Sequence, residues 1–167
     1  WSRGGGTLGG VVACGLSGPR RAVQGAARDH VLAVAGVTGA GECFKAGGKV
    51  LKNVTGFDLP RLLTGSRGSL AVFTEITVRL APLPPASATL CLPAEDAVRA
   101  LRLMADAMMV DGGITGAGWA DGTVRLRIEA SMAALPALMD QLSARLPGGH
   151  WRDGDDSRAL WAAMTNL

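Results

Sequence analysis

The first half of the chain alternates between apolar and other residues in two places, and this period of two predicts β-strands. Residues 29–44 alternate up to a glycine-rich turn at residues 39–41 and then return, which predicts a β-hairpin. Asp58 and Pro60 suit the start of a short helix whose buried face would carry Leu62 and Leu63. Residues 70–80 then predict a long strand, whose mostly apolar face would consist of Leu70, Val72, Thr74, Ile76, Val78 and Leu80.

The second half begins after a proline-rich segment. Three prolines within residues 82–85 cannot continue a central strand, so we expect a boundary here between domains 1–82 and 83–167. Residues 87–92 alternate as a strand. Residues 95–109 then repeat with a helical period, which predicts a helix with Val98, Leu101, Ala105 and Met108 on its apolar face.

A second hairpin is predicted around Asp121-Gly122. Its second strand, residues 123–129, would point Val124, Leu126 and Ile128 inward and Arg125, Arg127 and Glu129 outward. A second helix is expected to begin near Pro136, followed by a strand at residues 150–152. The order β-α-β-β-α-β predicts an α+β fold of the ferredoxin-like type, which we expect to be partial.

Composition removes several classes of protein. A hydrophobic content of 48% with 19% charged residues indicates a folded chain. The net charge of +3 is small and the arginines are scattered, so nucleic acid is not an expected partner. The three cysteines have no C-x-x-C spacing, and no metal site is expected.

No apolar run in the sequence approaches the ~20 residues of a transmembrane helix. The chain starts at Trp1 without a methionine, and we interpret it as a fragment.

Two glycine-rich segments carry the candidate chemistry. Gly4, Gly6 and Gly9 match G-x-G-x-x-G, with Asp29 at the distance of a ribose-binding acid, which would indicate an NAD(P)-dependent dehydrogenase. That motif requires a preceding strand and a long helix, and neither is predicted here. The second segment, residues 65–70, is a glycine-serine turn before a strand, whose exposed main-chain N–H groups suit a phosphate or a flat polar heterocycle.

The segment KNVTGFDLPRLLTGSRGSLAVFTEITVRL resembles the FAD-binding, PCMH-type domain of vanillyl-alcohol-oxidase-type flavoproteins. The loop GGTLGG, the SG turn and the segment RDHVLAVAGVTGAGE are similar to the same family in the same order, so the resemblance covers residues 4–80. It implies the second half of a PCMH-type FAD-binding domain, followed by a partial ferredoxin-like cap.

Within this family, ACGLSGPRR and KVLKNVTGFDLPRLLTGSRGSL are most similar to the FAD-binding subunits of bacterial glycolate oxidases. This resemblance implies an FAD-linked oxidoreductase that oxidises a small 2-hydroxy acid, glycolate, to glyoxylate. It also implies a larger FAD-containing subunit and an iron-sulfur subunit as partners, in the cytoplasm and at the inner membrane through those partners. It identifies no catalytic residue. A non-catalytic assembly subunit that keeps the flavoprotein fold stays open as an alternative.

The resemblance also implies which residues line the flavin. They match the family in the first glycine loop, the turn after it, the loop before the hairpin and the last turn: Gly6, Thr7, Gly9, Gly10, Ser17, Gly18, Gly25, Gly68, Ser69, Leu70 and Val72. Two positions depart from the family pattern. Arg67 stands where an acid is usual, and Ala71 stands where a glycine is usual, which would place a methyl group near the cofactor.

Overall fold

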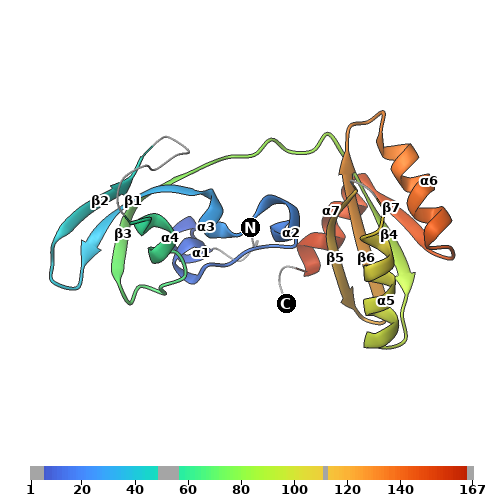
Figure 1. Ribbon diagram of the computed structural model, residues 1–167, viewed down its shortest axis with the longest axis horizontal. Coiled ribbons are helices and arrows are strands. Elements are labelled where there is room, and N and C mark those ends of the chain that lie inside the picture. Colours follow the sequence, from blue (N-terminus) through green and yellow to red (C-terminus); the bar gives the residue numbers. More distant parts are fainter. Residues whose placement is uncertain (1–5, 49–56, 111–112, 165–167) are drawn as a thin grey trace. The chain divides into compact units, whose positions relative to one another are not determined.

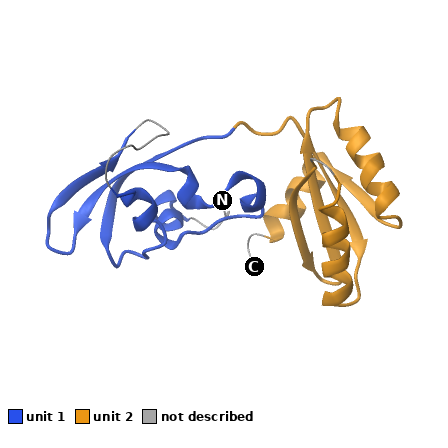
Figure 2. Ribbon diagram, in the orientation of Figure 1, with its two compact units in different colours: residues 1–81 blue, residues 82–167 orange. Residues whose placement is uncertain are grey.

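The computed structural model describes residues 6–48, 57–110 and 113–164. The chain divides into two compact units, residues 1–81 and 82–167, which Figure 2 shows in different colours. Each unit has its own sheet and its own hydrophobic core. Gly4 of the nucleotide motif and the KNVTG sequence at residues 52–56 lie outside the described residues.

The N-terminal unit is built on an antiparallel sheet with the strand order β2-β1-β3 (Figure 1). The predicted hairpin is confirmed, because β1 pairs with β2 around the turn at residues 39–42. A Rossmann unit requires a parallel sheet, so the antiparallel pairing argues against the dinucleotide motif. The elements described in this unit are α1 (Leu8–Cys14), α2 (Arg21–Gln24), α3 (Ala27–His30), β1 (Val31–Thr38), β2 (Cys43–Gly47), α4 (Leu59–Leu63) and β3 (Ala71–Val78).

Helix α4 begins as the sequence predicts. The Asp58 side chain accepts a hydrogen bond from the Arg61 N–H at 3.2 Å, and Pro60 occupies the first turn, where its missing N–H costs nothing. Leu63 is buried in the core as expected. Leu62 is 61% exposed, so its predicted burial is wrong. In a helix of five residues, two adjacent leucines point in different directions and only one can reach the sheet.

Strand β3 departs from the predicted alternation. Its core-facing residues are Ala71 and Phe73 near the start but Ile76 and Val78 near the end, so the phase shifts by one residue. The pairing with β1 has an irregularity at this point, since Phe73 and Glu75 face the consecutive residues 36 and 35. A bulge of this kind inserts one residue and moves the following side chains to the other face. The predicted apolar face is therefore wrong for the first half of the strand.

The C-terminal unit contains a four-stranded antiparallel sheet with the order β5-β6-β4-β7. The six elements from β4 to β7 follow each other as β-α-β-β-α-β, and this strand order is that of a ferredoxin-like fold. One further helix follows β7. The elements are β4 (Ala86–Pro93), α5 (Ala97–Ala107), β5 (Ile114–Ala120), β6 (Thr123–Ala130), α6 (Leu135–Arg145), β7 (His150–Asp153) and α7 (Gly154–Met164).

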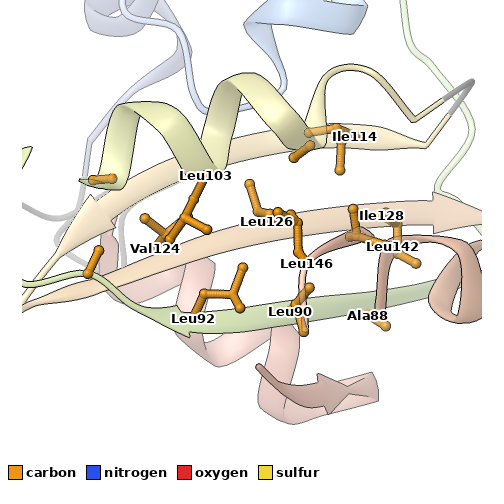
Figure 3. Close-up of a cluster of buried hydrophobic side chains, with 13 residues drawn as sticks. Ala88, Leu90, Leu92, Leu103, Ile114, Val124, Leu126, Ile128, Leu142 and Leu146 are labelled. Atoms are coloured by element: carbon orange, nitrogen blue, oxygen red, sulfur yellow. The ribbon is translucent and has the colours of Figure 1, made fainter. Parts of the chain in front are cut away.

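Helices α5 and α6 cover one face of this sheet. Figure 3 shows Leu103 of α5 and Leu142 of α6 in the same cluster as strand residues Leu90 and Leu126. The inward positions predicted for β6 are confirmed, because Val124, Leu126 and Ile128 are at most 1% exposed. The face predicted for the first helix is wrong. Its buried residues are Ala100, Leu103 and Ala107, whereas the predicted apolar face is exposed.

Helix α7 packs against the other face of the sheet, so the side chains predicted to point outward from β6 do not all meet water. Arg127 is 4% exposed and lies beneath the Trp161 ring, with its guanidinium carbon 4.6 Å from the ring centre. Thr89 and Ser157 are also buried here, and their hydroxyl oxygens are 2.7 Å apart. Arg127 points away from the α5 and α6 side of the sheet, as predicted, but it does not meet solvent, because helix α7 covers this side.

Candidate functional site

The first glycine segment forms the beginning of α1. Thr7 has an extended backbone and its side chain accepts a hydrogen bond from the Gly10 N–H at 3.0 Å, so it is the N-cap of this helix. Gly6 precedes the cap, and Gly9 lies in the first turn. The first N–H groups of any α-helix have no partner inside the helix. The segment therefore presents N–H donors at the start of α1, and Thr7 has a structural task that needs no ligand.

The second glycine segment contains a tight turn at Ser66–Ser69. Arg67 and Gly68 have φ angles of 53° and 78°, and the Ser69 N–H donates to the Ser66 carbonyl at 3.0 Å. Two consecutive positive φ angles with this hydrogen bond are typical of a type I′ turn. Arg67 is the residue that departs from the family pattern. Its positive φ angle is one that glycine adopts at little cost and that a residue with a long side chain rarely adopts.

This turn is joined to the C-terminal end of α1. The Gly65 N–H donates to the Val12 carbonyl at 3.0 Å, and the Arg67 N–H donates to the Ala13 carbonyl at 2.8 Å. A Cβ atom on Gly15, the C-cap of α1, would lie 3.2 Å from the Gly65 Cα atom. Two segments separated by about fifty residues are therefore held together by main-chain hydrogen bonds and a close glycine contact.

The loop after α1 brings three further predicted residues together. The Ser17 hydroxyl accepts a hydrogen bond from the Ala27 N–H at 3.0 Å, which ties this turn to the start of α3. Gly25 lies just before α3 with a φ angle of 88°, and a Cβ atom there would lie 3.0 Å from Asp29 Oδ2. Gly18 has no heavy atom within 4 Å of the position that a Cβ would take. Gly25 is thus required by its surroundings, whereas the space beside Gly18 is open.

Asp29 organises this loop. Its Oδ2 atom accepts a hydrogen bond from the Ala26 N–H at 2.8 Å, and its Oδ1 atom lies 2.9 Å from Arg61 Nη2. The hydrogen bond from Ala26, followed by the positive charge of Arg61, lowers the pKa of the Asp29 carboxyl below its ordinary value. The carboxylate therefore links α3 to α4. This is a task within the fold, and it differs from the ribose contact that the dinucleotide motif implied.

Leu70 immediately precedes β3 and Val72 is its second residue, so both lie beside the Ser66–Ser69 turn, and they are 49% and 66% exposed. Ala71 between them is 5% exposed and packs in the core with Val12 and Leu63. Its methyl group therefore points away from the side that Leu70 and Val72 present. The expectation that this methyl group would stand near a cofactor stays a prediction, and in the protein without a cofactor the methyl group fills part of the core.

The structure adds residues that the sequence pattern did not single out. The Ser66 hydroxyl oxygen is buried and makes no hydrogen bond to any residue that the structure describes. Arg61 and Asp29 come together only because α3 and α4 both pack near β1. Local sequence patterns give no signal for either feature, since both depend on contacts between segments far apart in the chain.

Two kinds of feature are not found in residues 6–48, 57–110 and 113–164. These residues contain no cluster of three or more histidine, cysteine or acidic side chains able to hold a metal ion. They also contain no helix of the length and apolar character needed to cross a bilayer.

Comparison with known sequences shows that the chain is similar to oxidoreductases, among them FAD-linked ones. No family model matches it. It is 39% identical to glycolate oxidase subunit GlcE of Escherichia coli (strain K12) over 148 residues, which are 87% of this chain and 42% of that protein. It is 39% identical to a D-lactate dehydrogenase of Archaeoglobus fulgidus over 52% of this chain and 20% of the relative. Glycolate oxidase subunit GlcD of Bacillus subtilis is 36% identical over 60% of this chain and 21% of the relative.

The chain thus spans less than half the length of these relatives. Solved structures show the same fold at low sequence identity. An alkyldihydroxyacetonephosphate synthase matches 95% of this chain and 36% of its own with a TM-score of 0.67 and 14% identity. A glucooligosaccharide oxidase of Acremonium strictum matches 93% of this chain and 35% of its own with a TM-score of 0.57 and 11% identity. Over the part that it spans, the chain is a homologue of the FAD-linked oxidoreductases and has the α+β fold of PCMH-type FAD-binding flavoproteins.

Proposed function

We propose that this chain is the FAD-binding part of a flavin-dependent oxidoreductase that acts on a small 2-hydroxy acid, with glycolate oxidised to glyoxylate. The relatives named above are described as glycolate oxidase subunits and D-lactate dehydrogenases, and both glycolate and lactate are 2-hydroxy acids. The observation that carries the proposal is the joining of the Ser66–Ser69 turn, by main-chain hydrogen bonds, to the C-terminal end of α1. The helix that the first glycine segment begins therefore packs against the turn of the second, and the exposed Leu70 and Val72 follow that turn.

The residues in this region fit FAD. The first turn of α1 offers N–H donors of the kind that bind a pyrophosphate, and the open space at Gly18 and Gly68 is space that a Cβ would fill. The buried Ser66 hydroxyl belongs to the Ser66–Ser69 turn that contains Gly68, and it would be able to donate to a polar edge of a ligand there. Leu70 and Val72 provide an apolar surface suited to a flat aromatic ring system.

These groups would bind and orient the cofactor. Bound FAD would itself supply the two-electron chemistry that oxidises the substrate. The predicted site residues are glycine, serine, threonine, leucine and valine, and none of them has a side chain that gains or loses a proton near neutral pH. Their contribution in this proposal is therefore to hold the ring system and exclude water from it.

The wider organisation is proposed on the same basis. Residues 1–82 would be the C-terminal part of the FAD-binding domain, and residues 83–167 the ferredoxin-like cap. The partners would be a larger FAD-containing subunit and an iron-sulfur subunit, and we propose a cytoplasmic assembly that reaches the inner membrane through them. The names of two relatives, GlcE and GlcD, describe subunits and support an assembly of more than one chain.

One observation favours a second function, a non-catalytic assembly subunit. Thr7 caps α1, and Gly25 is required by the position of Asp29, so part of the predicted site would persist for the sake of the fold alone. The visible absorption spectrum of the purified protein separates the two functions. Flavin bands support the first, whereas a colourless protein that still joins flavin-containing and iron-sulfur partners supports the second.

A matched pair of variants tests the site itself. Gly68 and Gly41 have φ angles of 78° and 79°, and neither has a heavy atom within 4 Å of its Cβ position. Gly41 belongs to the β1–β2 turn, whereas Gly68 belongs to the proposed flavin turn. Gly68→Val and Gly41→Val should therefore lower the melting temperature by similar amounts, because the backbone strain is the same. We expect only Gly68→Val to lower the flavin content measured at 450 nm. Equal flavin loss in both variants would contradict the proposed site.

A further inference from the structure

Helix α5 has two apolar faces, and only one of them is used by the fold. The inner face, with Ala100, Leu103 and Ala107, is buried against the sheet. The outer face of α5 consists of three residues on the opposite side of the helix and the two methionines that follow its last turn, and its four large side chains are 59–72% exposed: Val98, Leu101, Ala105, Met108 and Met109. A contiguous exposed patch of this kind indicates an interaction surface, since single exposed apolar residues are otherwise scattered.

The spacing on the outer face makes it a narrow stripe. Val98, Leu101, Ala105 and Met108 follow each other at intervals of three, four and three residues. The inner face has the same spacing and packs on a sheet, so the spacing alone does not identify the partner; a second helix is the partner that fits along a stripe of this width. The two methionines at the C-terminal end have flexible side chains that adapt to the surface they meet.

The charges beside the outer face indicate the partner's chemistry. Arg102 and Arg99 lie one turn apart along one border, both are exposed, and neither forms an ion pair with a residue that the structure describes. The acid on this border, Asp106, lies 3.8 Å from Arg145 of α6 and is already paired. The border is therefore positively charged, and a complementary helix would carry carboxylates there.

A second copy of α5 fits this surface poorly. Two α5 helices packed antiparallel about a two-fold axis would bring the arginine border of one helix along the arginine border of the other. Like charges placed in this way oppose association. We propose that the outer face of α5 binds an amphipathic helix of another polypeptide, with acidic residues along the border that meets Arg99 and Arg102. This inference does not depend on the proposed oxidoreductase activity.

Site-specific photo-crosslinking in the native assembly tests this inference. A benzoylphenylalanine at position 101 of the full chain is expected to crosslink to a helical segment of a different polypeptide that carries Glu or Asp beside its apolar seam. Peptide sequencing of the product by mass spectrometry identifies that segment. Crosslinks only to a second copy of this chain, only to lipid, or to no other molecule would overturn the proposal.

Charge substitutions give an independent measurement on the same partner. Leu101→Glu and Arg102→Glu should each weaken its binding at least tenfold in pull-down titrations, and higher salt should weaken the binding of the unaltered protein. Met132→Glu is the matched control, because Met132 is 72% exposed in the same unit but lies outside α5. Circular dichroism should show unchanged melting temperatures for all three variants. Equal binding by Leu101→Glu and Met132→Glu would refute the role of the outer face, whatever the flavin content.

Discussion

Replacing Arg127 with methionine should strongly destabilise the C-terminal unit. The Arg127 and Glu129 side chains are 5% and 3% exposed, and Arg127 Nε lies 3.4 Å from Glu129 Oε1. The guanidinium also donates to the Thr115 carbonyl at 2.9 Å and to the Thr115 hydroxyl at 3.1 Å. Trp161 of α7 covers the guanidinium, so little water could replace it beside the carboxylate. The substitution therefore removes a positive charge from next to a buried negative one.

Burial decides the magnitude. Exposed ion pairs contribute about 0–1 kcal/mol, whereas removing one partner of a buried pair costs about 3–5 kcal/mol, because the remaining charge is left in a poorly solvated place. Arg127→Met should therefore lower the free energy of unfolding by about 3–5 kcal/mol. Arg158→Met is the control, since Arg158 and its partner Asp155 are 73% and 94% exposed, and its cost should be at most about 1 kcal/mol.

Urea unfolding followed by tryptophan fluorescence measures these costs. Trp119, Trp151 and Trp161 all belong to residues 82–167, so the signal reports mainly on the C-terminal unit. The double variant Arg127→Met with Glu129→Met should be more stable than Arg127→Met alone, because the buried negative charge that Arg127 faces is removed as well. A loss below 1 kcal/mol for Arg127→Met, or simply additive losses in the double variant, would show that the buried pair is not the origin of the effect.

Three further expectations concern single side chains. Cys91 is 3% exposed, and burial raises the pKa of its thiol, so iodoacetamide should label the two exposed cysteines in the folded protein and leave Cys91 unlabelled until urea is added. The pKa of Asp29 is lowered in the folded state, so its charge stabilises the fold above the ordinary carboxyl range and ceases to do so as the pH falls through it. Asp29→Asn should accordingly lower the melting temperature at pH 7, with a smaller difference below about pH 4. Leu126→Ala removes a side chain that is 0% exposed and should cost about 2–5 kcal/mol in urea unfolding.

Strong local signals in the sequence predicted the elements that the structure contains. The Asp121-Gly122 dipeptide marks the turn between β5 and β6, and alternation placed Val124 and Leu126 in the core. Asp58 marks the start of α4 through a contact only three residues away. These features depend on torsions and contacts between near neighbours in the chain. Such information is present in the local sequence itself.

The wrong predictions all concern which side of an element meets the core. Helix α5 has apolar residues on two faces, and nothing within the helix indicates that Leu103 points to the sheet and Leu101 does not. In β3 a bulge near Thr74 exchanges the faces partway along the strand. Arg127 is buried because α7, more than twenty residues later, covers it with Trp161. Packing between distant segments decides each case, and a periodic pattern carries no record of it.

The glycines in and near the predicted site fall into two groups, those that the fold requires and those that it does not. Gly15 and Gly25 are explained by the fold alone, because a Cβ at either position would come within 3.2 Å of another residue, and both have positive φ angles. Gly18 is different, since neither its φ angle nor any heavy atom within 4 Å requires a glycine. The fold therefore tolerates a side chain at position 18, as it does at Gly39 of the β1–β2 turn, and only at Gly18 does the proposed FAD site give a reason for a small residue. Gly18→Ala should leave the melting temperature of the flavin-free protein unchanged and raise the dissociation constant for FAD, measured by quenching of flavin fluorescence. Unchanged affinity would remove Gly18 from the cofactor site and leave the joined turn at Gly68 as the part of it still supported.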